Sequence, residues 1–325
     1  MAHYLVTGAA GFIAARVSEM LLAAGHSLTG VDNLCDSYDI RLKEWRLQRL
    51  QAHPGFQFIK ADICDFEPLT RALDASGPYE AVIHLAARAG VRASVENPWV
   101  YVQTNMTGAL NILEYSRRHA IQKIVLASTS SLYGSSNQPP YHEDGDTDHP
   151  LSPYAASKKG AEAMAYTYHH LYGLDITIFR YFTVYGPAGR PDMSPLRFTQ
   201  WIAEGRPVTV TGDGSQVRDF TYVDDIARGT ILGLQLKGFQ AVNLGNDAPR
   251  PLMDMIHILE KEFGRPAQMR FEPMPRADVN ATQASIQRAG ELLGWEPEIS
   301  LEEGLARLAD WYKAERSWAS QILTP

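Results

Sequence analysis

The sequence predicts an α/β protein with a doubly wound parallel sheet and a smaller, loop-rich C-terminal part. Two patterns lead to this prediction. Runs of β-prone residues alternate with helical stretches, as expected of a parallel sheet with right-handed crossovers. The predicted strands cover residues 4–6, 26–31, 56–60, 81–85, 123–127 and 175–180. From about residue 181, prolines and isolated arginines become denser, which indicates a region rich in loops.

The length of the chain agrees with one large domain and a smaller partner. The chain has 325 residues, of which 45% are hydrophobic, enough for a sizeable core. We expect residues 1–180 to form the first domain. Residues 223–236 have the pattern of a helix that returns to the main sheet, so we assign about 219–246 to the first domain as well. The smaller domain takes most of residues 181–325, and the two interleave along the chain.

The first predicted strand leads into a glycine-rich turn of the type that binds dinucleotides. Gly8 and Gly11 occupy the first two glycine positions, and Ala14 occupies the third. Gly8 permits the tight turn, and Gly11 lets the backbone approach a pyrophosphate at the helix N-terminus. Asp32 follows the second strand, where a carboxylate can accept the ribose hydroxyls. The sequence therefore predicts a Rossmann-type domain that binds NAD, because an unpaired carboxylate at Asp32 would repel the 2′-phosphate of NADP.

A tyrosine and a lysine supply the candidate acid–base chemistry. Tyr154 and Lys158 are four residues apart in the run SPYAASKKGAE, so they share one face of a helix. A nearby ammonium lowers the pKa of a tyrosine, which lets the phenol act as a base nearer neutral pH. The spacing alone is also typical of a solvated helix face. The Ser/Thr cluster at residues 128–131 follows a predicted strand end, so we expect it to share a cleft with the glycine turn.

Charge and composition argue against several classes of function. The formal net charge is −7 and no basic run exceeds a few residues, which argues against a nucleic-acid partner or a membrane surface. No run of 18 or more apolar residues occurs and the chain begins with a predicted strand, so we expect a cytoplasmic protein. Cys35 and Cys64 lack metal-ligand spacing, and no metal site is predicted.

Seven motifs, taken in order, resemble those of the NAD-dependent epimerase/dehydratase family of extended short-chain dehydrogenases. They are TGAAGFIA, Asp32, Asp62, HLAA at 84–87, STSSLYG at 128–134, YAASK at 154–158 and RDFTYVDD at 218–225. The resemblance implies bound NAD, a smaller domain that binds a UDP-sugar, and the activity of an isomerase. Within the family, DNLCDSYDIRLKEWRL, ARAGVRASVENP and YFTVYGPAGRPDM most resemble the enzymes that epimerise UDP-glucuronate at carbon 4.

The resemblance implies a mechanism of transient oxidation. Tyr154 would take the proton of the sugar 4-hydroxyl while hydride passes to NAD, and the 4-keto sugar would turn over before hydride returns. Thr129 would bond the same oxygen and relay the proton, although a strand-end cap is its alternative role. Lys158 would bond the nicotinamide ribose. Ser130 and Ser131 stand where dehydratases and decarboxylases of the family carry carboxyl groups, so elimination and decarboxylation are disfavoured.

The resemblance also implies which residues bind each ligand. The predicted NAD contacts are Gly8, Gly11, Phe12, Ile13, Asp32, Asn33, Asp62, Ile63, Leu85, Ala86, Ala87, Tyr154 and Lys158. The predicted UDP-sugar contacts are Arg92, Ser130, Ser131, Thr183, Arg190, Val210, Arg218 and Arg276. The carboxylate of a uronic acid would meet Ser130, Ser131, Thr183 and Arg190; alternatively, these serines satisfy backbone groups and Arg190 forms a surface ion pair. His84 is expected to serve structure.

Other functions and an assembly remain open at this point. UDP-glucose and UDP-N-acetylglucosamine 4-epimerases share most of these residues. A non-enzymatic NAD-binding regulator would usually lack the tyrosine or the lysine, and a reductase that releases NADPH is disfavoured by Asp32. Residues 98–119 and the helix bearing Tyr154 resemble segments that form a four-helix dimer interface in relatives, so a homodimer is expected by analogy.

Overall fold

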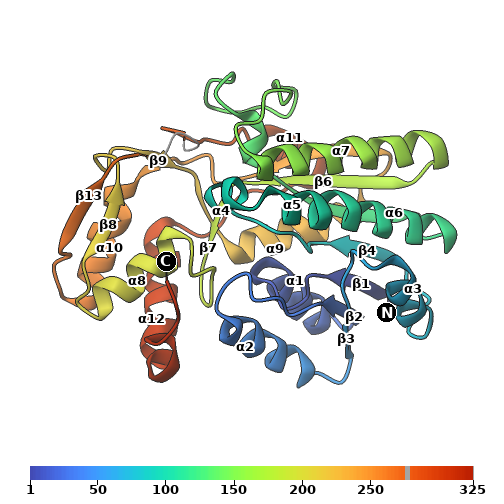
Figure 1. The fold of residues 1–325 in the computed structure, drawn as a ribbon, viewed down its shortest axis with the longest axis horizontal. Helices are drawn as coiled ribbons and strands as arrows, with labels where there is room; N and C mark the ends of the chain where they lie inside the picture. The colour runs from blue at the N-terminus through green and yellow to red at the C-terminus, as the bar shows by residue number, and fades with distance from the viewer. Residues whose placement is uncertain (275–278, 325) are drawn as a thin grey trace.

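The main sheet is parallel and doubly wound. The structure, a computed structural model, describes residues 1–274 and 279–324. In this part of the chain the largest sheet has seven strands in the order β11-β6-β5-β4-β1-β2-β3 (Figure 1). Every pairing in it is parallel, and the order runs outward from β1 in both directions. These strands are β1 (His3–Thr7), β2 (Ser27–Asp32), β3 (Phe56–Lys60), β4 (Ala81–His84), β5 (Lys123–Thr129), β6 (Asp175–Tyr181) and β11 (Phe239–Leu244). The predicted fold class is confirmed.

Helices cover both faces of this sheet because neighbouring strand residues point to opposite sides. Val6 and Val125 pack in one core with α1, α9 and α11, whereas Leu5 and Ile124 pack in another with α3, α6 and α7. The helices of this part are α1 (Phe12–Ala23), α2 (Ile40–Gln51), α3 (Phe66–Asp74), α4 (Val91–Glu96), α5 (Pro98–Tyr101), η1 (Val102–Thr107), α6 (Gly108–Arg118), η2 (Ser130–Tyr133), α7 (Pro153–Tyr172), α9 (Val223–Leu232), η3 (Gly233–Gln235) and α11 (Gln287–Leu293).

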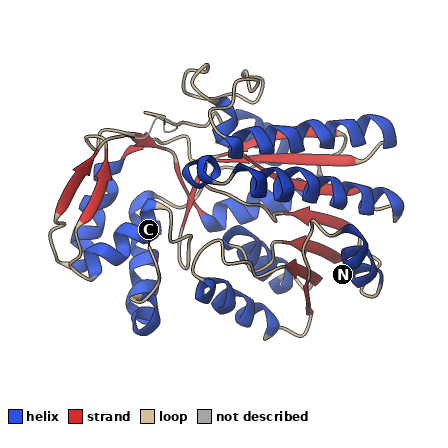
Figure 2. Ribbon diagram, viewed as in Figure 1, coloured by secondary structure: helices blue, strands red, loops and turns tan. Residues whose placement is uncertain are grey.

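A smaller group of elements lies beside the carboxyl ends of the strands (Figure 2). It contains three helices, α8 (Ser194–Ala203), α10 (Leu252–Phe263) and α12 (Leu301–Ala319), which share one hydrophobic core. Three two-stranded sheets accompany them, β10–β7, β12–β9 and β13–β8. Their strands are β7 (Thr183–Tyr185), β8 (Val208–Thr211), β9 (Val217–Arg218), β10 (Phe220–Tyr222), β12 (Arg250–Pro251) and β13 (Met269–Glu272).

The chain returns to the main sheet after residue 222. Helix α9 packs on α1, and β11 adds the outermost strand beside β6. The sequence pattern indicated the helix of this segment but not the strand. In the described part of the chain, no helix is both long and apolar enough to cross a membrane.

Candidate active site

The glycine-rich turn brings β1 and α1 together as predicted. Gly8 has a φ of +71°, and a Cβ there would lie 2.7 Å from the Cα of Ala86. A Cβ on Gly11 would lie 2.8 Å from the carbonyl oxygen of Gly8. Gly11 precedes the first residue of α1, and no side chain caps that helix. The free N–H groups at this end are therefore available to an anionic pyrophosphate.

Asp32 lies beside this turn, and its carboxylate is paired with groups of the protein. Its oxygens accept hydrogen bonds from the backbone N–H groups of Ala10 at 3.2 Å and Leu34 at 2.8 Å. Lys43 from α2 also reaches Asp32, with Nζ 3.3 Å from Oδ1, and both side chains are buried. The expectation of an unpaired carboxylate is therefore wrong, and Lys43 offsets part of its negative charge.

The other predicted adenosine contacts gather at the ends of β2 and β3. Asn33 donates from Nδ2 to Oδ2 of Asp62 at 2.8 Å, and Oδ1 of Asp62 accepts the backbone N–H of Cys64 at 2.8 Å. Ile63 is buried against Gly108 of α6. These bonds fix the loop after β3 next to the loop after β2, where a nucleoside could be held.

A cavity of about 300 Å³ opens at the carboxyl ends of β1, β4, β5 and β6. It brings together most of the predicted site. Predicted residues in its lining are Gly8, Gly11, Phe12, Ile13, Leu85, Ala87, Thr129, Ser130, Ser131, Tyr154, Lys158, Thr183 and Arg190. Asp32, Asn33, Asp62, Ile63 and Ala86 do not line it. Sequence reasoning missed Tyr38, Ala89, Gly90, Val91 and Met193, which line it as well.

Helix α7 carries Tyr154 and Lys158 into this cavity. Ser152 caps the helix by accepting the backbone N–H of Ala155 at 3.2 Å, Pro153 takes the first helical position, and Gly173 ends the helix with a φ of +70°. Such caps hold the first turn in a fixed place. Tyr154 therefore sits one residue inside a capped helix, and Lys158 follows one turn later, buried.

Thr129 meets Tyr154 from the end of β5. Its Oγ1 accepts the backbone N–H of Ser131 at 3.1 Å and lies 3.2 Å from the Ser131 hydroxyl, so Thr129 caps η2. It also lies close enough to the Tyr154 phenol to favour its ionised form. The structure therefore shows the alternative role of Thr129 as a strand-end cap, and its bond to the sugar oxygen stays a prediction.

Burial dominates the ionisation of this group. It raises the pKa of Tyr154, while Thr129 and the positive charge of Arg190 act in the opposite direction. The expectation that Lys158 lowers this pKa is wrong, because Thr129 and Arg190 have that effect instead. Burial lowers the pKa of Lys158 to about 8, against the negative charge of Glu162. Burial and the charge of Lys158 lower the pKa of His84 to about 3.

A buried ionic network that the sequence did not reveal supports the lysine. Glu162, one turn beyond Lys158, accepts a hydrogen bond from the Ser128 hydroxyl at 2.5 Å. It also pairs with Arg180 of β6 at 2.9 Å, and Arg180 donates to the hydroxyl of Tyr133 at 3.1 Å. The network ties α7 to the ends of β5 and β6. Its one sequence signal was the spacing of Lys158 and Glu162.

The predicted sugar contacts divide into two groups. Ser130, Ser131, Thr183 and Arg190 line the cavity, and Nη2 of Arg190 donates to the Ala89 carbonyl at 3.2 Å. Arg190 also pairs with Asp192. The remaining predicted contacts stand outside the lining: Arg92 near Thr211, Val210 buried in β8, and Arg218 beside Asn280. Arg276 lies outside the described residues.

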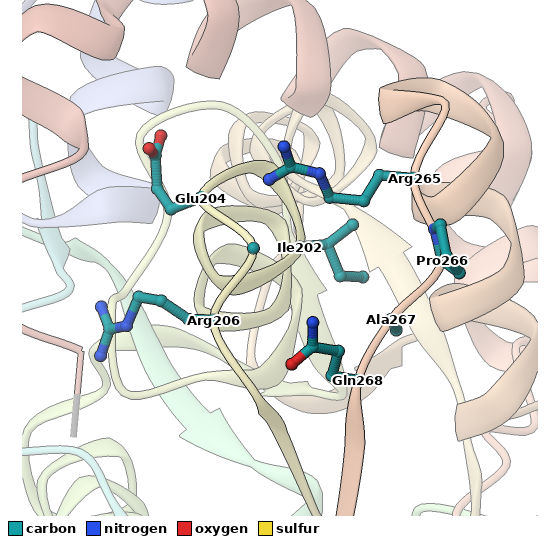
Figure 3. Close-up of a pocket in the computed structure, with 8 residues that line it drawn as sticks. Ile202, Glu204, Arg206, Arg265, Pro266, Ala267 and Gln268 are labelled. Carbon is teal, nitrogen blue, oxygen red and sulfur yellow. The ribbon is translucent and has the colours of Figure 1, made fainter.

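A larger cavity of about 490 Å³ lies in the C-terminal part, away from these groups (Figure 3). It is lined by Ile202, Glu204, Gly205, Arg206, Arg265, Pro266, Ala267 and Gln268. Its charged side chains have partners within the protein: Arg206 donates to Gln200, Arg265 donates to the Ala203 carbonyl, and Glu204 pairs with Arg316. No predicted site residue lines it, so the candidate site is the smaller cavity.

Comparison with known proteins agrees with this geometry. The model of the NAD dependent epimerase/dehydratase family matches residues 4–245. A UDP-glucuronate 4-epimerase from Thermodesulfobacterium geofontis is 55% identical over 96% of this chain and 97% of its own length. The crystal structure of UDP-glucuronic acid 4-epimerase from Bacillus cereus, in complex with UDP-glucuronic acid and NAD, superposes with a TM-score of 0.90 at 36% identity, covering 96% of this chain and 99% of that one. A UDP-glucose 4-epimerase from Thermotoga maritima, solved with UDP-glucose, has a TM-score of 0.90 at 32% identity, with coverages of 97% and 99%. The chain therefore belongs to the NAD-dependent epimerase/dehydratase family.

Proposed function

We propose that this protein is an NAD-dependent isomerase that converts UDP-glucuronate to UDP-galacturonate by inverting carbon 4 of the sugar. The observation that carries the proposal is one cavity in which Tyr154 and Thr129 lie with the glycine-rich turn and Arg190. The 55% identity to a UDP-glucuronate 4-epimerase supports the same substrate. NAD fits the turn because the N-terminus of α1 is uncapped and the two glycines leave room for a pyrophosphate.

The chemistry follows from the positions of three side chains. Bound NAD supplies a hydride acceptor that can also return the hydride. Tyr154 would take the proton of the 4-hydroxyl as the C4–H bond breaks, and return it when hydride comes back to the other face of the 4-keto sugar. Because burial raises the pKa of this phenol, only its ionised fraction could act as the base. Thr129 would hydrogen-bond the same 4-hydroxyl, and its contact favours the ionised phenol. Lys158, buried one turn further along α7 and in the lining of the same cavity, would bond the nicotinamide ribose.

A uronic acid requires that the enzyme retain its carboxylate. The 4-keto intermediate is a β-keto acid, which loses carbon dioxide when the carboxylate bond aligns with the carbonyl π-system. Hydroxyls of Ser130, Ser131 and Thr183 would fix the carboxylate away from that alignment, and Arg190 would offset its desolvation. No carboxyl group stands at residues 130 and 131, so neither side chain can serve as an acid for elimination.

One observation favours a second candidate, a UDP-glucose 4-epimerase. Arg190 already pairs with Asp192, which offsets the charge that a sugar carboxylate would need. A neutral sugar would make no such demand. The uronic acid remains the better substrate on our proposal because Arg190 donates through several N–H groups and can bind Asp192 and a second carboxylate together.

Product analysis decides between these substrates. The purified protein would be desalted, assayed for retained NAD, and incubated separately with UDP-glucuronate, UDP-glucose and UDP-N-acetylglucosamine, with products resolved by NMR. We expect UDP-galacturonate to form fastest, without UDP-pentose. Faster conversion of UDP-glucose would replace the proposed substrate, and no conversion of any sugar by NAD-loaded protein would contradict the enzyme assignment.

We also propose a homodimer and the interleaved domains described above, with residues 1–180 and 219–246 binding NAD. Apolar side chains stand exposed along α4, α5 and η1, among them Val95, Trp99 and Val102, with Trp99 77% exposed. Tyr166 of α7 is exposed as well, and α6 and α7 run side by side on one face of the molecule (Figure 1). A second copy is the partner that would cover these side chains together.

A further inference from the structure

Arg46 of α2 is a buried cation that joins the glycine-rich turn to the loop before Arg190. It is 3% exposed. Its Nη1 donates to the carbonyl of Ala10 in the glycine-rich turn at 3.0 Å and to the hydroxyl of Tyr38 at 2.8 Å. On its other edge, Nε and Nη2 donate to the Ala188 carbonyl at 3.0 and 2.6 Å, and Nη2 also donates to the Gly189 carbonyl at 3.2 Å.

These contacts use the whole guanidinium. An arginine has five N–H donors, and five contacts join Arg46 to neutral oxygens. A lysine has three donors on one nitrogen and cannot span both edges. Burying a cation whose hydrogen bonds all end on neutral oxygens adds little stability. The position of the two partner segments is therefore the property that Arg46 controls most directly.

The second of these segments ends at Arg190. Gly186 has a φ of +150°, and Ala188, which is not a glycine, has a φ of +51°. A non-glycine residue with a positive φ is strained unless neighbouring groups stabilise it. Arg46 supplies two hydrogen bonds to the carbonyl of Ala188. Two residues later, Arg190 lines the cavity and donates to the Ala89 carbonyl. A shift of Ala188 would therefore move the guanidinium of Arg190.

We propose that Arg46 is a positioning residue that fixes the loop of residues 186–190 against the glycine-rich turn and thereby places Arg190 for the substrate carboxylate. The placement of the loop is inferred only from the hydrogen bonds of Arg46. The effect on sugar selectivity rests on the function proposed above.

The test uses Arg46→Lys and Arg46→Met, with Arg49→Lys and Arg49→Met as matched controls. Arg49 lies on the same helix, but it is exposed and pairs with Glu19 at the surface. In NAD-loaded protein, both Arg46 variants should exchange the amides of residues 186–192 faster than wild type, while β5 keeps its protection. Affinity for UDP-glucuronate should fall about tenfold or more, and affinity for UDP alone should stay nearly unchanged. The Arg49 variants should match wild type in every measurement.

A double-mutant cycle shows whether Arg46 acts through Arg190. Arg190→Met should weaken UDP-glucuronate binding, and adding Arg46→Met should weaken it little further. Additive losses, equal losses for UDP and UDP-glucuronate, or unchanged exchange of the loop would each overturn the proposal. Failure of even Arg46→Lys to fold would do the same, by making its role structural. If the loop loosens but wild type does not prefer UDP-glucuronate to UDP-glucose, the positioning stands and the proposed substrate falls.

Discussion

The ion pair between Asp32 and Lys43 determines how strongly this protein should distinguish NAD from NADP. Burial acts to lower the pKa of Lys43, but the charge of Asp32, together with Cys35 and Tyr38, outweighs it and the pKa is raised, so Lys43 is a cation at neutral pH. Two unit charges about 4 Å apart interact by about 4 kcal/mol at an effective dielectric constant near 20. With Nζ 3.3 Å from Asp32, Lys43 would attract a 2′-phosphate almost as strongly as Asp32 repels it.

Two substitutions separate these opposing effects. Lys43→Met should leave the charge of Asp32 uncompensated and weaken NADPH relative to NADH by about 1–3 kcal/mol, or about 10- to 100-fold, after allowance for screening by water. Asp32→Ser should have the opposite effect, because Lys43 would then be free to pair with the phosphate. The affinity of the double variant for NADPH relative to NADH should lie between those of the two single variants.

Separate titrations of NAD-free protein with NADH and with NADPH, followed by the fluorescence of the bound nicotinamide, measure the ratio of the two affinities. Lys261→Met, on the exposed side of α10, is the control for loss of one positive charge. If Lys43→Met has the same ratio of NADPH to NADH affinity as wild type, the ammonium of Lys43 does not act on the 2′-phosphate of the adenosine ribose. Retained preference for NADH in Asp32→Ser would remove Asp32 from cofactor selection.

Changes at four other positions test the base, the substrate, the core and the surface. Tyr154→Phe should keep NAD bound but slow epimerisation by about 10²- to 10⁴-fold, since the proton acceptor is lost; near-normal turnover by NMR would exclude it as the base. Thr183→Ala should lose more kcat/KM on UDP-glucuronate than on UDP-glucose, and equal losses would contradict the carboxylate contact. Burial lowers the pKa of Lys123 from 10.5 to about 8, so between these pH values the unfolded state binds the proton more strongly than the folded state. The free energy of unfolding should therefore rise with pH across this range by up to about 3 kcal/mol, and denaturant titrations of Lys123→Met should lack this rise. Trp99→Lys should give a monomer in sedimentation, whereas an unchanged mass would place the interface elsewhere.

The sheet could be predicted because its signals are local. Each strand is a short β-prone run, and its side-chain alternation sorts neighbours such as Leu5 and Val6 into the two cores. Parallel topology then places every strand end on one edge, which is why residues from four separate motifs line one cavity. Strand β11 was not predicted because its run FQAVNL is interrupted by the polar residues Gln240 and Asn243.

Contacts between distant segments could not be predicted in the same way. Arg46 bonds to Ala188, 142 residues away, and no spacing along the chain records that distance. The pairing of Asp32 with Lys43 depends on where α2 packs. The effect of Lys158 on Tyr154 was inferred from a separation of four residues, yet burial of the phenol, a tertiary property, sets the direction of its pKa. Local spacing identifies which groups can meet, and packing decides their charges.

On the proposed mechanism, the single hydroxyl of Thr129 would serve both the fold and the reaction. The bond from the backbone N–H of Ser131 uses a lone pair of Oγ1 and fixes the oxygen at the end of β5. It leaves the hydroxyl hydrogen free to point to the Ser131 hydroxyl or to Tyr154. When Tyr154 is neutral, its own hydrogen can point to Thr129; when it is ionised, the hydrogen of Thr129 can turn toward it. The cap thus fixes the oxygen of Thr129, and only its hydroxyl hydrogen rotates when Tyr154 gains or loses its proton. No movement of the backbone is required during turnover.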